Sequence, residues 1–112
     1  MVRQAGDPRV RYIGFRIDQD GVSRNRLIEE IRRTGRAIDP QGFEAASPWL
    51  TRYDGTHGIV RCTHTGVAVT RRILETIRFD EGQIETVGTS GTIRGLVSKH
   101  LPQLAERDDT RP

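Results

Sequence analysis

Residues 49–63, WLTRYDGTHGIVRCT, decide the fold of this chain. Two runs rich in aromatic and β-branched residues, Trp49–Tyr53 and Gly58–Thr63, flank a polar connection that contains Gly55. A glycine-containing connection of this length between two such runs is typical of a β-hairpin. The middle of the chain is therefore predicted to form two antiparallel strands.

Upstream of the hairpin, the sequence predicts a strand and then a helix. In residues 9–18 apolar side chains occupy every second position, as in a half-buried strand; they are Ile13, Phe15 and Ile17. Ser23 predicts a helix N-cap after the Asp20-Gly21 turn, and Gly35 predicts the helix end. Residues 36–47 are predicted to be a loop with a short helical turn near Phe43–Ala46, because Asp39-Pro40 and Gly42 interrupt any helical pattern.

Downstream of the hairpin, the pattern repeats. A helix is predicted from Thr65 or Gly66 to about Arg78, followed by a strand over 83–87. After the glycine-rich residues 88–92, a final amphipathic helix is predicted to end at Pro102, with apolar positions at Ile93, Leu96, Val97 and Leu101.

The predicted order is therefore strand, helix, strand, strand, helix, strand, and a last helix. This order indicates an α+β, two-layer α/β sandwich of the ferredoxin-like type, with a four-stranded antiparallel sheet plus a C-terminal helix. We expect one domain over residues 9–102, between a flexible N-terminus (1–8) and a flexible C-terminal tail (103–112). Many functions use this fold, so it does not identify one.

Composition limits the classes of function. The chain has 112 residues, a net charge of +3, seventeen arginines and a single lysine, Lys99. Arginine suits phosphate recognition, so the excess is compatible with nucleic acid, but a GC-rich genome that encodes arginine for lysine explains it equally well. The absence of a long apolar run and of a secretory signal, together with the single Cys62, predicts a cytoplasmic protein that does not bind membranes.

Few residues are candidates for catalysis. Cys62 and His64, two apart on a predicted strand, would point in parallel, and no third orienting group follows them. The remaining ligands of a zinc site are missing. We therefore predict no catalytic residue and no bound metal, with Cys62 as a small core residue.

Two features are candidates for RNA contact. The stretch Gly88–Thr92 enters a helix N-terminus, where free N–H groups and hydroxyls can hold a phosphate, although a simple turn capped by Ser90 explains it as well. On the strands, Arg16 and Arg61 lie opposite the apolar face, with the aromatic residues Tyr12, Trp49 and Tyr53 as candidate neighbours. That face is predicted either to stack bases or to be covered by the last helix or a protein partner.

Three motifs resemble the archaeal and eukaryotic ribonuclease P protein component 2 family. Residues 87–96, VGTSGTIRGL, resemble the Gly-x-Ser-Gly-Thr closing signature of that family. Residues 11–15, RYIGF, resemble its opening strand, and Tyr53-Asp54 with Gly58–Cys62 resembles its central hairpin. The similarity covers roughly residues 9–101.

The resemblance implies a protein subunit of ribonuclease P, which assists a catalytic RNA in removing 5′ leaders from precursor tRNA. Chemistry would be carried by the RNA with Mg²⁺, and this chain would bind no cofactor. Its partners would be the catalytic RNA, component 3 and other protein subunits, with precursor tRNA in the complex. The residues predicted to contact RNA are Arg11, Arg16, Arg61, Thr89, Ser90, Thr92, Arg94 and Lys99. The alternatives are a free-standing single-stranded-RNA-binding domain that uses Tyr12 or Tyr53, and a ligand-sensing or enzymatic ferredoxin-like domain.

Overall fold

The computed structural model describes residues 9–101. In chain order the elements are β1 (Val10–Ile17), α1 (Arg24–Ile38), α2 (Pro40–Ala46), β2 (Trp49–Tyr53), β3 (His57–Thr63), a 3₁₀ turn (His64–Gly66), α3 (Val67–Thr76), β4 (Ile84–Ser90) and α4 (Ile93–His100). The predicted flexible ends, 1–8 and 103–112, and the predicted stop at Pro102 lie outside the described residues.

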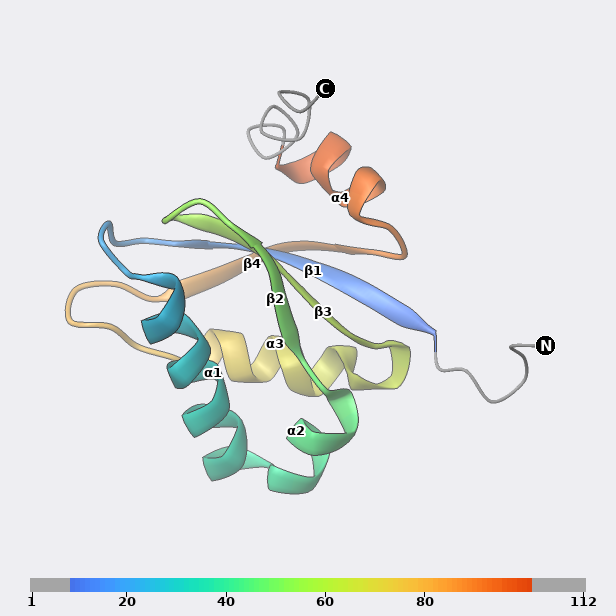
Figure 1. The fold of residues 1–112 in the computed structure, drawn as a ribbon, viewed down its shortest axis with the longest axis horizontal. Helices are drawn as coiled ribbons and strands as arrows, with labels where there is room; N and C mark the ends of the chain where they lie inside the picture. The colour runs from blue at the N-terminus through green and yellow to red at the C-terminus, as the bar shows by residue number, and fades with distance from the viewer. Residues whose placement is uncertain (1–8, 102–112) are drawn as a thin grey trace.

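The four strands form one antiparallel sheet in the order β2-β3-β1-β4. β1 lies in the centre, where Tyr12 faces Arg61 of β3 on one side and Ser90 of β4 on the other. Helices α1, α2 and α3 cover one face of the sheet, and α4 lies on the opposite face (Figure 1). The predicted ferredoxin-like sandwich with a C-terminal helix is therefore confirmed.

The main core lies between the sheet and helices α1–α3. Phe15 is fully buried there, and its ring stacks on Tyr53 with the ring centroids 6.4 Å apart. Gly58 makes room for that ring, because a Cβ atom at Gly58 would lie 2.5 Å from Cζ of Phe15. Full burial of a side chain of this size contributes about 1.5–3 kcal/mol, so the predicted alternation along β1 is a main source of stability.

Helix α1 extends beyond its predicted end at Gly35. It runs to Ile38, and the N–H of Asp39 still donates to the Gly35 carbonyl at 3.0 Å. Gly35 is buried against Phe43 of α2, where a Cβ atom would lie only 2.3 Å from Cδ1 of that ring. The prediction of a helix end was wrong because this glycine allows two helices to approach closely.

Residues 36–47 are mostly helical, so the predicted loop was also wrong. Asp39 is the N-cap of α2, and its Oδ1 accepts from the N–H of Gly42 at 3.0 Å. Pro40 occupies the first turn, where its missing N–H removes no helical hydrogen bond. The Asp-Pro pair therefore marks the start of a helix, which includes the predicted turn at Phe43–Ala46 and ends at Ser47 with φ of 50°.

The second half of the sheet differs from prediction at its boundaries. Helix α3 ends at Thr76 instead of about Arg78. β4 reaches Ser90, three residues beyond its predicted end, so the residues from Gly88 to Ser90 belong to the strand. The register between β1 and β4 shifts at Gly14/Phe15, which gives β4 one additional residue opposite β1.

Helix α4 forms a second, smaller core on the far face of the sheet. Leu96, Val97 and Leu101 are buried there against Ile59. Gly14 and Gly88 face each other across β1 and β4 and form a flat floor under the helix. A Cβ atom at Gly88 would lie 2.5 Å from the His100 ring, so these glycines allow α4 to lie close to the strands.

The β2–β3 hairpin contains Tyr53, a titratable group whose pKa is strongly raised by its surroundings. Its hydroxyl donates to the Val22 carbonyl at 2.7 Å, and a second acceptor, the Gly55 carbonyl oxygen, lies 2.8 Å from the same hydroxyl oxygen. Burial and, second, the charge of Asp54 raise the pKa of Tyr53 from 10.0 to about 12. The folded state thus holds this proton more tightly than the unfolded state.

We expect this proton to make stability depend on pH in the alkaline range. The contribution is complete below pH 10.0 and is lost as the pH rises through about 12, so the free energy of unfolding should fall across that window. Tyr53→Phe should flatten that part of the profile, as measured by urea denaturation at a series of pH values. An unchanged profile in the variant would contradict the assignment.

Candidate nucleic-acid interface

Charge is unevenly distributed along the strand direction. Three segments contain Arg or Lys and no carboxylate. Of the fifteen described Arg and Lys residues, three lie in residues 9–17, three in 55–74 and two in 86–101, whereas none of the eleven described Asp and Glu residues lies in these segments. Antiparallel pairing places the start of β1 beside the ends of β3 and β4. The end of the sheet where these segments meet therefore carries positive side chains, and none of the three segments contributes a carboxylate to it. We call it the basic end and define it as Arg9, Arg11, Arg61, Ser90, Thr92 and Arg94.

The opposite end of the sheet is acidic. The turns after β1, after β2 and before β4 meet there: the Ile17 N–H donates to the Thr56 carbonyl, and the Asp18 N–H to the Gln83 carbonyl. In Figure 1 these turns lie at the left and the basic end at the right. The carboxylates on or beside them are Asp18, Asp20, Asp54, Asp80, Glu81 and Glu85. A polyanion would be attracted to one end and repelled by the other.

The turn from β4 into α4 supplies hydroxyl groups to the basic end. The N-cap is Thr92, whose Oγ1 accepts from the Gly95 N–H at 3.0 Å; the predicted cap, Ser90, instead accepts from the Thr92 N–H at 3.2 Å. Each hydroxyl accepts a hydrogen bond there and keeps its own O–H as a donor. Nη1 of Arg11 lies 3.9 Å from the position of a Cβ atom at Gly91, so a guanidinium stands beside this turn.

The structure separates the predicted RNA contacts into two groups. The basic end holds five of them: Arg11, Arg61, Ser90, Thr92 and Arg94. Thr89 adjoins this group on the edge strand β4, and Lys99 lies in the last turn of α4. Arg16 lies near the other end of β1, where its Nε donates to Glu85 at 2.8 Å. Sequence reasoning missed Arg9, whose carbonyl accepts from the His64 N–H.

The three aromatic candidates do not share a face. Tyr53 lies on the helix-covered face in the main core, and Tyr12 packs against the α4 cluster on the other face. Trp49, opposite Arg61 in the register, is 51% exposed. Neither tyrosine is therefore an open platform for stacking bases, which argues against the free-standing single-stranded-RNA-binding domain.

The described residues show no arrangement suited to side-chain catalysis. Cys62 is buried as predicted, and burial raises the pKa of its thiol, which disfavours the reactive thiolate. His64 lies in the 3₁₀ turn and not on a strand, so the predicted parallel placement with Cys62 was wrong. Among residues 9–101, no three His, Cys, Asp or Glu side chains are grouped to hold a metal ion.

One surface hollow of about 590 Å³ lies between β4 and α3. Most of its charged groups already have partners: Glu85 pairs with Arg16, and Thr86 donates to Glu75 and accepts from Arg71. Few polar groups remain free to converge on a small molecule. The hollow therefore gives little support to a ligand-sensing domain.

No helix within residues 9–101 combines the length and apolar character needed to cross a membrane.

The fold and this surface define a class, a small basic α+β domain with helices on both faces of its sheet and one end suited to a polyanion. No family model matches the chain. Ribonuclease P protein component 2 of Pyrococcus furiosus is 31% identical over 104 residues, which cover 87% of each chain. The component 2 proteins of Methanosarcina barkeri and Methanocaldococcus jannaschii are 32% and 34% identical, over 90% and 81% of this chain and 78% and 72% of theirs.

The chain belongs to the ribonuclease P protein component 2 family. It is thus a protein subunit of ribonuclease P, the ribonucleoprotein endoribonuclease of tRNA 5′ maturation, and the resemblance seen in the sequence motifs is confirmed. The fold also matches a chain in the cryo-electron microscopy structure of yeast ribonuclease MRP, with a TM-score of 0.64 at 12% identity over 95% of this chain and 98% of that chain.

Proposed function

We propose that the basic end binds the catalytic RNA of ribonuclease P and stabilises the compact fold in which that RNA cleaves precursor tRNA. The single observation that supports this most is the convergence of three segments without carboxylates at one end of the sheet. Crowded phosphates repel one another, so cations placed among them favour the compact form of the RNA. A protein that binds this form and not the unfolded one stabilises it by mass action.

The division of labour in this proposal follows from the chemistry of the surface. Guanidinium groups and hydroxyls can bind phosphate oxygens, but they are poor general bases near neutral pH. We therefore assign hydrolysis to the RNA and its Mg²⁺, with no cofactor bound by this chain. Arg11, Arg61 and Arg94 would neutralise phosphates, while the O–H groups of Ser90 and Thr92 would orient one of them at the start of α4.

The other parts of the proposal concern partners and place. Component 3 and further protein subunits would share the assembly, precursor tRNA would be the substrate, and the cytoplasm would be the site of action. Thr89, Lys99 and Arg16 remain predicted contacts at the periphery, with Arg16 the weakest because Glu85 neutralises its charge.

Reconstitution tests the proposal. Cleavage of precursor tRNA should be measured over a range of Mg²⁺ concentrations with the cognate RNA alone, with component 3 added, and with component 3 and this subunit together. We expect the complete set to cleave at lower Mg²⁺ than RNA with component 3 alone, because protein cations replace part of the metal-ion screening. If this subunit leaves cleavage unchanged at every Mg²⁺ concentration, the proposal is wrong.

A further inference from the structure

Trp49 is the one large hydrophobic side chain that the described residues leave exposed, at 51%. It begins β2, which is an edge strand of the sheet, and it is the only tryptophan in the chain. Leaving an indole half in water forgoes the burial that would otherwise stabilise the fold. Tryptophan is enriched at binding interfaces, where one part of the ring is buried and its N–H keeps a polar partner.

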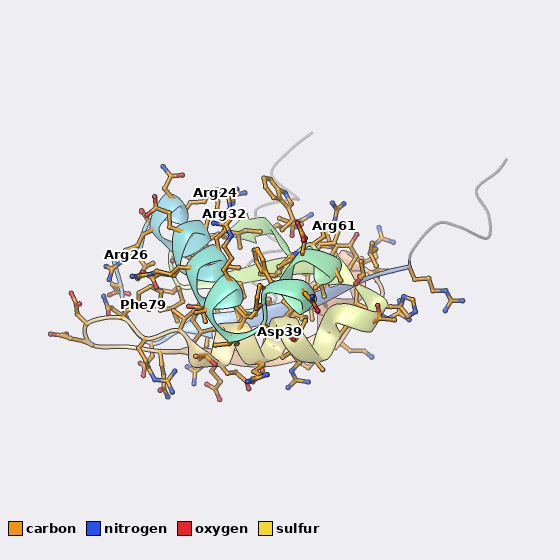
Figure 2. The ribbon with its side chains drawn as sticks, turned by 90° about the horizontal axis from the view of Figure 1, so that it is seen from below. Arg24, Arg26, Arg32, Asp39, Arg61 and Phe79 are labelled. Carbon is orange, nitrogen blue, oxygen red and sulfur yellow. The ribbon has the colours of Figure 1, made fainter. Side chains whose placement is uncertain are left out.

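Two exposed arginines neighbour Trp49, Arg61 through the strand register and Arg32 through a shared cavity. Arg61 faces Trp49 across the β2–β3 ladder and faces Tyr12 across the β3–β1 ladder, so the three form one row on the sheet. Arg32 of α1 lines a small cavity of about 40 Å³ together with Trp49. Both arginines are exposed, and within residues 9–101 neither side chain makes an ion pair or hydrogen bond. In Figure 2 the labels of Arg32 and Arg61 both lie in the upper half of the view.

These features favour one kind of occupant. The cavity is too small for a buried ligand or a large protein side chain, but the indole face itself is accessible. The residues that line the cavity include no carboxylate, so Arg32 is not neutralised there. Aromatic rings stack on nucleobases, and free guanidinium groups bind the phosphates on either side of a stacked base.

We propose that Trp49 stacks on an unpaired nucleotide of the bound RNA, whose flanking phosphates are held by Arg61 and Arg32. This inference rests on the proposed RNA-binding function and adds a contact of a different kind. Phosphate binding at the basic end is indifferent to base pairing, whereas stacking on Trp49 requires a base that has left its helix. The subunit would therefore prefer RNA with an unpaired residue to a continuous duplex.

The single tryptophan provides a direct test without mutation. Intrinsic tryptophan fluorescence of the full chain should be followed during titration with a mixed-sequence single-stranded 12-nucleotide RNA, with its perfect duplex, and with the ribonuclease P RNA transcript. A stacked base quenches indole emission. We expect quenching with the single strand and the transcript, and little change with the duplex even where it binds.

Two substitutions separate stacking from other roles of the side chain. Trp49→Leu keeps an apolar residue but removes the stacking surface, and it should weaken single-strand binding by about 10-fold, because the stacking of one base is lost. Trp49→Phe keeps a smaller aromatic face and should lose only part of this affinity. Arg61→Gln should also weaken single-strand binding, and Arg36→Gln, which removes an exposed charge from α1 at a residue that does not line the cavity, is its matched control.

The outcomes are distinguishable from those of the proposed function. If RNA binds with normal affinity and the indole emission does not change, the stacking inference is wrong while the proposed function stands. If the fluorine resonance of labelled Trp49 shifts on addition of component 3 and not of RNA, the patch is a protein contact and the inference is again wrong. Absence of any RNA binding would remove both proposals.

Discussion

Replacing Arg11, Arg61 and Arg94 together by glutamine is expected to lower affinity for ribonuclease P RNA by roughly 500-fold at about 0.1 M salt. The estimate assumes that each guanidinium neutralises one phosphate and releases about 0.9 counterion, so three lost contacts lower log K by about 2.7 at that salt. The slope of log K against log salt should flatten by about 3. Filter binding or fluorescence anisotropy over a range of salt concentrations measures both quantities.

The matched control is the triple replacement of Arg26, Arg33 and Arg36 by glutamine. It removes the same formal charge from α1, where Arg33 pairs with Glu30 and Arg26 lies 5.1 Å from the centre of the Phe79 ring. Figure 2 shows Arg26 and Phe79 at one end of the molecule and Arg61 toward the other. Long-range attraction falls equally in both variants, so equal losses of affinity would mean that net charge and not the basic end determines binding.

Gly35→Val is expected to destabilise the protein by about 3 kcal/mol, at the upper end of the usual cost of overpacking a core. Helix propensity alone predicts a small gain, since glycine is among the least favourable residues in a helix interior. The structure predicts a loss of stability instead of this gain. Any Cβ atom at Gly35 would lie 2.3 Å from Cδ1 of Phe43 and would push α2 away from α1. Urea or thermal unfolding followed by circular dichroism gives the change in free energy.

Ala37→Val in the same helix is the control for this prediction. Ala37 is exposed, so the substitution changes only intrinsic helix propensity and should cost less than about 1 kcal/mol. A Gly35→Val variant as stable as Ala37→Val would show that Phe43 moves aside at little cost. The close approach of α1 and α2 would then not explain the buried glycine.

The hairpin, the two long helices and β1 were predictable because their signals are local. Alternation along β1 and the 3.6-residue periodicity of α1, α3 and α4 depend only on which face of each element is buried. The errors concern Gly35 and Asp39-Pro40, whose meaning depends on a partner. Glycine and proline interrupt helices on average, but here one allows a helix crossing and the other begins a helix.

The candidate site was only partly predictable, for a similar reason. Arg61 and Arg94 could be selected as cations on a strand and a helix, yet their proximity to Arg11 follows from strand pairing. The sequence already contains the signal of three segments without carboxylates. Its significance depends on those segments meeting at one end of the sheet. Trp49 could be identified as an aromatic residue on a strand, but not as the exposed one.

The order of elements, the membership of the component 2 family and the excess of arginine are properties of the chain, because periodicity, motifs and composition survive without a fold. The separation of a basic end from an acidic end arises only when antiparallel strands bring distant residues together. The same holds for the role of Gly35, the neutralisation of Arg16 by Glu85 and the covering of Tyr12 by α4. Each depends on a neighbour that is remote in sequence, and only tertiary contacts determine which neighbour that is.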